Sequence, residues 1–302
     1  MNNIYKLQPL TYSNYLELAS FIDNHNYIEK FWSPIAMTEY KSYGLEFYFH
    51  ILEDESAIIF YGKGTNNKKW KISTSFYIQN FSLDKINKII SEDLQILNND
   101  SIREYKQISK SMIIDWKLDE NSIYELPYVS NYVYKTEAFK TFAGKKLQKK
   151  RNHLNYFLLN NQNVIVKNIK ELTSEEILAF CMKHMTNYSQ KYNESEIESY
   201  KHIVNNDMKN NTNFVGVAIY IENQLEALTL CYLRKDICEV IIEKANKEIR
   251  GLYQFLIREN LLFNNINQEY MDRQDDYDLE YLTKSKMSYY PIITEHRYSS
   301  KK

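Results

Sequence analysis

The sequence predicts an α/β protein with mixed sheets, built as two domains in tandem. Its 302 residues exceed the usual size of one domain, so two domains of about 150 residues are expected. Helical periodicity and strand-like runs occur together in both halves. In the second half, three strand-like runs follow one another with short turns, which predicts an antiparallel meander. We place the boundary near residue 140, which gives domains 1–140 and 141–302.

The first half shows signals for both helix and strand. Residues 57–61 form an apolar run typical of a central strand, and residues 71–78 alternate between polar and apolar side chains. Ser82 is placed to cap a helix over 83–97, in which the apolar residues recur at helical spacing. Two more apolar runs, at 112–114 and 132–134, predict further strands.

The second half repeats this mixture. Thr173 and Glu176 have capping-box spacing, so a helix should begin there and extend to about Asn187. The other elements predicted are helices at 145–159, 195–209 and 251–264, strands at 164–166, 214–220, 225–233 and 237–242, and an edge strand near Pro291.

Composition excludes several classes of protein. Hydrophobic residues make up 44% and charged residues 25%, as in a folded globular protein. The net charge of −1 gives no overall attraction to polyanions, so any such binding requires a local patch. Cys181, Cys231 and Cys238 are odd in number and lack metal-ligand spacing, so we expect reduced, buried thiols and no metal site. No stretch is long and apolar enough to span a membrane, and no leader is visible, so we expect a cytoplasmic protein.

A strongly basic helix is the main candidate for such a patch. Residues 139–159 contain no acidic residue, so the cations of this helix have no partner at helical spacing. Unpaired cations can bind phosphate, and a guanidinium can do so with two parallel hydrogen bonds; a solvated charged face is the alternative. The candidate phosphate-binding residues here are Lys145, Lys146, Lys149, Lys150, Arg151, Asn152 and His153.

Three blocks of sequence resemble one known family. The first is G-K-K-L-Q-K-K-R-N-H at 144–153, and the second is I-E-K-A-N at 242–246 followed by G-L-Y at 251–253. The third is D-R-Q-D-D at 272–276 with L-T-K-S-K-M-S-Y-Y-P at 282–291. In this order they resemble the C-terminal domain of phosphatidylglycerol lysyltransferases, which implies two GNAT-like domains. The helix pair, meander and following helix have the order found in GNAT-type acyltransferases.

The resemblance implies a reaction and roles for the residues that match. The donor would be an aminoacyl-tRNA, and the aminoacyl group would pass to an amine or hydroxyl of a lipid headgroup, a peptide or a small molecule. Arg273, Lys284 and Lys286 would bind donor phosphates or polarise the carbonyl, with Arg250 as a further phosphate ligand. Glu243, Asp275 and Asp276 would hold or deprotonate the attacking amine. We expect one pocket to be shared by Glu243, Arg273, Asp275 or Asp276, and Lys284 or Lys286.

Two other functions stay open. Acyl-CoA could be the donor, but the stretch 244–251 contains a single glycine where GNAT enzymes have a glycine-rich turn for the pyrophosphate. A binding module without turnover is the second alternative, because the third block departs from the family pattern. Asp272 stands in place of Asn, Gln274 in place of Glu, Asp278 in place of Gly and Thr283 in place of Arg. No cofactor is expected, and peripheral contact with a membrane remains open.

Overall fold

The computed structural model describes residues 5–37, 44–64, 67–98, 103–185 and 190–301, with no side-chain description at 67, 68, 129 and 190–195. The chain is a mixed α/β protein with two sheets, as the sequence predicts. It divides into two compact units, residues 1–130 with 295–302 and residues 131–294. The sequence instead placed the boundary near 140 and assigned the C-terminal residues to the second domain.

The first unit is organised by a five-stranded sheet. Its strand order is β1-β2-β3-β4, and β5 pairs with β3. The elements in the first 122 residues are β1 (Gln8–Pro9), α1 (Tyr15–Asp23), β2 (Leu45–Ile51), β3 (Ala57–Gly64), β4 (Asn67–Ile72), β5 (Phe76–Tyr77), α3 (Leu83–Ile96), α4 (Lys110–Asp115) and the 3₁₀ turn η1 (Glu120–Ser122).

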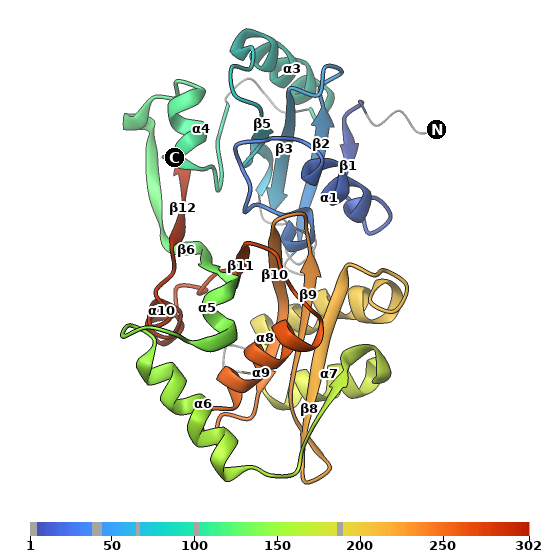
Figure 1. The fold of residues 1–302 in the computed structure, drawn as a ribbon. Coiled ribbons are helices and arrows are strands. Elements are labelled where there is room, and N and C mark those ends of the chain that lie inside the picture. The colour runs from blue at the N-terminus through green and yellow to red at the C-terminus, as the bar shows by residue number, and fades with distance from the viewer. Residues whose placement is uncertain (1–4, 38–43, 65–66, 99–102, 186–189, 302) are drawn as a thin grey trace. The chain divides into compact units, whose positions relative to one another are not determined.

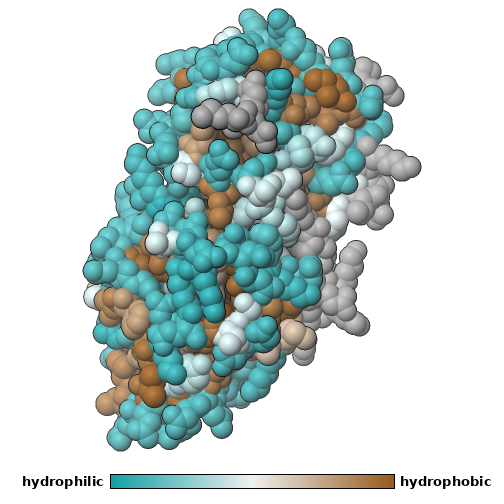
Figure 2. Space-filling model, turned by 90° about the vertical axis from the view of Figure 1, so that its right-hand side faces the viewer, coloured by the Kyte–Doolittle hydropathy of each residue, from teal (hydrophilic) through white to brown (hydrophobic). Residues whose placement is uncertain are grey.

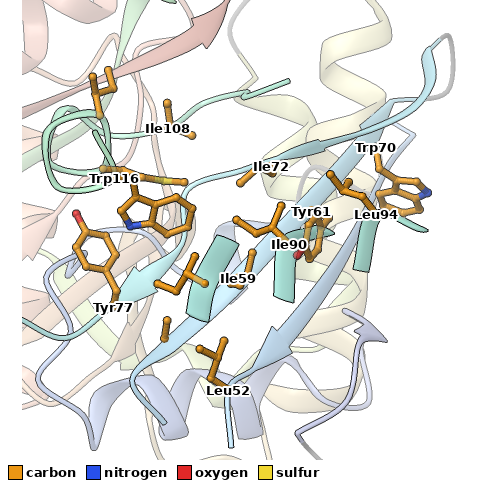
Figure 3. Packing of buried hydrophobic residues seen from close by; sticks show 14 of the residues in the cluster. Leu52, Ile59, Tyr61, Trp70, Ile72, Tyr77, Ile90, Leu94, Ile108 and Trp116 are labelled. Carbon is orange, nitrogen blue, oxygen red and sulfur yellow. The ribbon is translucent and has the colours of Figure 1, made fainter. Parts of the chain in front are cut away.

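The hydrophobic core of this unit lies between the sheet and helix α3. Ile86, Ile90 and Leu94 of α3 recur every four residues and pack against Ile59 and Ile72 of the sheet (Figure 3). Ser82 caps the helix by accepting a hydrogen bond from the backbone N–H of Lys85, as predicted.

Two strand predictions in the first half need correction. Residues 112–114 are helical, because Ser109 caps α4 by accepting from the backbone N–H of Met112. The run at 71–78 is interrupted: β4 ends at Ile72, and the Ser75 hydroxyl donates to the Ser73 carbonyl before β5 begins. Local side-chain hydrogen bonds of this kind compete with a continuous ladder.

The second sheet has seven strands in the order β12-β6-β11-β10-β9-β8-β7. The predicted meander of three strands is present as β8, β9 and β10, with antiparallel pairing. The elements are β6 (Ile123–Lys135), α5 (Thr136–Thr141), α6 (Gln148–Asn160), β7 (Val164–Asn168), the 3₁₀ turn η2 (Ile169–Glu171), α7 (Ser174–Lys183), α8 (Gln190–His202), the π-helical η3 (Ile203–Asp207), β8 (Phe214–Ile221), β9 (Gln224–Leu233), β10 (Ile237–Ala245), α9 (Leu252–Phe263), β11 (Tyr270–Asp272), α10 (Glu280–Met287) and β12 (Ile293–Ser300).

Helix α9 lies across the long strands β8–β10, and α5 and α6 pack on α9 (Figure 1). The capping box of Thr173 and Glu176 starts α7 as predicted, but α7 ends at Lys183, and residues 186–189 lie outside the described part. The three cysteines are buried free thiols. The face drawn in Figure 2 is mostly hydrophilic, and no described helix is long and apolar enough to cross a membrane.

Candidate active site in the second unit

The candidate site lies where the parallel strands β10 and β11 part. They pair only from Ile237 to Glu239 and from Tyr270 to Asp272. Strand β11 then ends, while β10 continues to Ala245. Beyond Glu239 and Asp272 the two strands no longer form hydrogen bonds to each other, so side chains can enter the space between them. Glu243 of β10 and Arg273 after β11 meet there.

Glu243 and Arg273 form a bidentate ion pair. The Arg273 Nη2 donates to Glu243 Oε1 at 2.5 Å and its Nε donates to Oε2 at 3.1 Å. The two side chains are only 10% and 12% exposed. Tyr289 lies 4.8 Å from the guanidinium, measured to the ring centre, with Phe139 and Tyr134 just below 6 Å. The Arg273 Nη1 is buried and has no hydrogen-bond partner among the described residues, so both of its N–H groups are left for a ligand.

The Lys286 ammonium donates hydrogen bonds to three backbone carbonyl oxygens of the loop that follows β11. Its Nζ donates to the carbonyl oxygens of Arg273 at 2.6 Å and Gln274 at 3.2 Å, and also to that of Asp275. An ammonium has three donors, so none is left for a substrate. Burial lowers the pKa of Lys286 to about 8, against an opposing effect of Asp275. Lys286 therefore positions the loop that carries Arg273 and Asp275.

Asp276 and Asp272 are both held by hydrogen bonds within the protein. Asp276 accepts hydrogen bonds from the Tyr132 hydroxyl at 2.6 Å, the Thr283 hydroxyl at 2.7 Å and the backbone N–H of Asp278 at 3.1 Å. Asp272 accepts from the Asn131 amide at 2.7 Å and from the backbone N–H of Gln274 at 2.9 Å. Both side chains are 2% exposed. These carboxylates shape the loop rather than face a ligand.

Asp275 differs from its neighbours. Its carboxylate is half-buried and accepts a hydrogen bond from the backbone of Tyr277, and no side chain among the described residues pairs with it. Burial raises the pKa of Asp275 to about 7, the Lys286 ammonium and the Tyr277 hydrogen bond oppose this shift, and Asp276 and Glu196 add to it. A carboxylate that titrates near neutrality and has no side-chain partner can accept a proton from a substrate.

A basic cavity lies beside these groups, at the N-terminus of α9. Its volume is about 330 Å³, and four basic side chains line it together with one acidic side chain, Glu248. Helix N-termini and cations both favour anions. The residues that line the cavity are Lys150, His153, Lys247, Glu248, Ile249, Arg250, Gly251, Tyr253 and Gln254.

Lys150 connects the cavity with the Glu243–Arg273 pair. Its Nζ lies 3.8 Å from the centre of the Tyr289 ring, the same ring that contacts Arg273. Burial lowers the pKa of Lys150 to about 8, and the Arg273 charge adds to this shift. The Tyr289 hydroxyl accepts a hydrogen bond from the Gln254 amide at 2.5 Å. Tyr289 thus lies between the ion pair and two residues that line the cavity, Lys150 and Gln254.

Comparisons with known proteins identify the family. Residues 104–301 match the model described as phosphatidylglycerol lysyltransferase, C-terminal. The chain belongs to the phosphatidylglycerol lysyltransferase C-terminal family. This is a family of aminoacyltransferase domains.

A curated relative and two solved structures extend this result. An uncharacterised protein of Mycoplasmoides gallisepticum, MYCGA3080, is 28% identical over 190 residues, which are 61% of this chain, and the match spans about 60% of that relative's length. A conserved protein of unknown function from Bacteroides thetaiotaomicron superposes with a TM-score of 0.77 at 18% identity, over 99% of this chain and all of that one. A tandem GNAT protein from the clavulanic acid pathway gives 0.52 at 7% identity, covering 98% of each chain. The fold is thus that of tandem GNAT proteins.

The structure separates the basic residues of the family's first block. Arg151 donates to the Phe142 carbonyl at 2.6 Å and to the Gly144 carbonyl at 3.3 Å, so it fixes the turn before α6. Lys150 and His153 line the basic cavity, whereas Lys145, Lys149 and Asn152 are exposed. Burial and the charges of Arg250 and Lys150 lower the pKa of His153.

The third block is divided in the same way. Lys284 is 73% exposed and pairs with Glu280 at 2.5 Å, so it does not join Glu243, Arg273, Asp275 and Lys286. Thr283 donates a hydrogen bond from its hydroxyl to Asp276.

Several site residues were not found from the sequence. Glu196 pairs with Lys244 at 2.9 Å and influences Asp275, but it lies in α8, far from any family block. Tyr289 was quoted in the third block, yet no role was assigned to it. Lys247 follows β10 in the stretch searched for a glycine-rich turn, and a search for cations there would have found it. Among the described residues, no group of His, Cys, Asp or Glu could hold a metal ion.

Proposed function

We propose that the second unit transfers an aminoacyl group from a tRNA ester to an amine or hydroxyl acceptor. One observation carries this proposal: in the loop after β11, Asp275 has a carboxylate that no described side chain pairs with, and Arg273 has an unpartnered Nη1. A base for the nucleophile and a donor for the carbonyl oxygen are the two functions that acyl transfer requires.

The step follows from these two groups. The acceptor nitrogen or oxygen attacks the ester carbonyl carbon, and Asp275 takes the proton that the acceptor loses. The Arg273 Nη1 donates to the oxygen on which negative charge develops. Collapse of the intermediate breaks the bond to the ribose oxygen, which receives the proton from Asp275. The products are the acylated acceptor and a tRNA with a free hydroxyl.

The basic cavity is the proposed site for a phosphate of the donor. Lys150, His153, Lys247 and Arg250 would surround the phosphate, and the backbone N–H groups at the start of α9 would add donors. An ester donor is already activated, so binding and orientation supply much of the rate enhancement.

Binding and turnover can be tested together. We would measure binding of lysyl-tRNA, uncharged tRNA and coenzyme A by calorimetry, and the transfer of radioactive lysine to vesicles of phosphatidylglycerol or to an amine panel. We expect tighter binding of tRNA than of coenzyme A, and transfer that Asp275→Asn reduces by about 10²- to 10⁴-fold. Tighter binding of coenzyme A would instead support the acyl-CoA alternative, and tRNA binding without any transfer would support the binding module.

A further inference from the structure

Exposed tyrosines lie against cations at the edge of the basic cavity. Arg250, which lines the cavity, stacks over the ring of Tyr156 at 4.4 Å. Tyr156 is 43% exposed, although it lies on α6 among residues that pack on α9. A tyrosine held by a cation and open to solvent on its remaining surface is a ready platform for another flat ring.

The approach to Tyr156 is basic along one face of α6. Lys150, His153 and Tyr156 follow one another at three-residue steps along α6, and Lys146 lies in the turn just before the helix. At 1.5 Å per residue, the span from Lys150 to Tyr156 is roughly 9 Å. This stripe carries positive charge from the turn before α6 to the exposed ring.

A second exposed tyrosine lies at the other end of this stripe. Lys146 lies 5.6 Å from the centre of the Tyr290 ring, and Tyr290 is 51% exposed. Its φ of 56° is a left-handed conformation that is costly for an aromatic residue. The turn buries Tyr289 against Lys150 and leaves Tyr290 outside, so the strained backbone keeps a large ring exposed beside a cation.

We infer that Tyr156 and Tyr290, which we call the tyrosine rim, bind the unpaired 3′ end of tRNA by stacking on its bases. This inference rests on the proposed function and specifies how its donor is recognised. Single-stranded nucleic acid is bound by aromatic rings that stack on bases and by cations that contact the phosphates between them. The tyrosine rim offers rings of this kind, with Lys146, Lys150 and Arg250 between and beside them.

An anionic membrane is the natural rival partner. Leu158 and Leu159 are also exposed on α6, and lysines next to apolar side chains suit a lipid surface. The two partners differ in what they require of Tyr156: a base needs only the flat ring, whereas a lipid surface draws on apolar area spread over several residues. The substitutions below separate them.

The test uses the full chain and a fluorescent RNA tetranucleotide ending in CCA, with binding followed by anisotropy at several salt concentrations. Loss of stacking should weaken RNA binding roughly 5- to 100-fold in Tyr156→Ala and in Tyr290→Ala. The slope of log K against log salt should stay as in the wild type, since no phosphate contact is removed. Tyr156→Phe should bind as the wild type does, because its ring is retained.

Tyr124→Ala is the matched control, because Tyr124 is 44% exposed and belongs to the first unit. Unchanged RNA binding in Tyr156→Ala and Tyr290→Ala would overturn the inference. It would also be overturned if phosphatidylglycerol vesicles compete with the RNA and Leu158→Ser loses this vesicle binding.

If the tyrosine variants lose RNA binding but the wild-type protein transfers no lysine, the inference stands and the proposed function fails. If lysine transfer occurs and the tyrosine variants retain it and RNA binding, the function stands and the inference fails.

Discussion

A buried arginine–glutamate pair lies in each unit, and the two pairs differ in how they are built. In the first unit, Arg297 Nη1 meets Glu29 Oε2 at 3.4 Å through a single contact. In the second, Arg273 holds both oxygens of Glu243, at 2.5 and 3.1 Å. Each arginine also has one buried nitrogen with no hydrogen-bond partner among the described residues, Nη2 of Arg297 and Nη1 of Arg273.

The surroundings of the two pairs decide what each can do. Ser109 donates to Glu29, Ser130 accepts from the Arg297 Nε at 3.1 Å, and Trp32 lies 5.2 Å from the guanidinium. Arg297 is 1% exposed and Glu29 6%, so this pair lies in a packed interior and joins the C-terminal strand to the N-terminal segment of its unit. The Arg273 pair instead lies near the Asp275 carboxylate, which no described side chain pairs with, and contacts the Tyr289 ring, which also contacts Lys150 of the basic cavity. A buried charge pair is thus structural or functional according to what its spare groups face.

The largest expected effect is on stability in the first unit. Arg297→Met leaves the Glu29 carboxylate buried without its cation, and burial already raises the pKa of Glu29. We expect the free energy of unfolding in urea to fall by about 3–5 kcal/mol. The double variant Glu29→Gln with Arg297→Met should recover part of this loss, because no charge is then stranded. A loss below about 1 kcal/mol would mean that the pair does not hold the strand.

A substitution in the second pair should affect the transfer reaction more than one in the first pair. Arg273→Lys keeps the charge but cannot provide both the bidentate contact to Glu243 and the spare N–H. We expect lysine transfer to fall by about 10²- to 10³-fold, or about 2.7–4 kcal/mol in the activation barrier. The matched variant Arg297→Lys should leave the transfer rate of the folded protein unchanged. Equal effects of the two variants on transfer would remove the distinction between the pairs.

Gly251 tests whether the packing beside the second pair matters. Its φ is +87°, and a Cβ there would lie 2.0 Å from the His153 carbonyl oxygen, so α6 and α9 can approach only because this residue is glycine. We expect Gly251→Ala to lower the free energy of unfolding by roughly 3 kcal/mol and to weaken RNA binding. Gly144 also has a positive φ but no atom within 4 Å of its Cβ position, so Gly144→Ala should cost only about 1 kcal/mol. Similar losses in both variants would show that backbone strain alone is responsible.

Much of the fold could be predicted because its signals are local. The Ser82 cap, the capping box at Thr173 and the short turns of the meander depend on neighbouring residues. Helix α10 was missed because none of its residues is buried, so it has no apolar stripe to detect. Residues 112–114 were assigned to a strand because a short apolar run does not distinguish strand from helix.

The candidate site could be predicted only in outline. Strand-end reasoning predicted that Glu243, Arg273 and Asp275 lie together, since residues that follow parallel strands gather at one edge of a sheet, and in the structure Glu243 and Arg273 form an ion pair. It could not show that Lys286 uses its three donors on backbone carbonyls, because that depends on where α10 packs. The effect of Glu196 on the pKa of Asp275 likewise could not be predicted, because it depends on how helix α8 packs in the folded protein.

The smallest expected effect is on the pH dependence of stability, and it comes from Asp272, the residue next to Arg273 of the second pair. Burial, together with the nearby Glu239, raises the pKa of Asp272 to about 7, while the hydrogen bonds from Gln274 and Asn131 oppose this. The folded protein therefore retains a proton between about pH 4 and pH 7 that the unfolded chain releases, so this group makes the protein less stable as pH rises through that range.

Asp272→Asn removes this titration and introduces an amide, the residue type that the family has at this position, able to accept from Gln274 and to donate toward Glu239. We expect the variant to match the wild type near pH 4 and to exceed its free energy of unfolding by roughly 1–3 kcal/mol at pH 8. The exposed turn variant Asp236→Asn should leave the pH dependence as it is. If Asp272→Asn is instead destabilised equally at pH 4 and pH 8, the Asp272 carboxylate stabilises the loop through its hydrogen bonds alone. The pH dependence of the free energy of unfolding then comes from other groups.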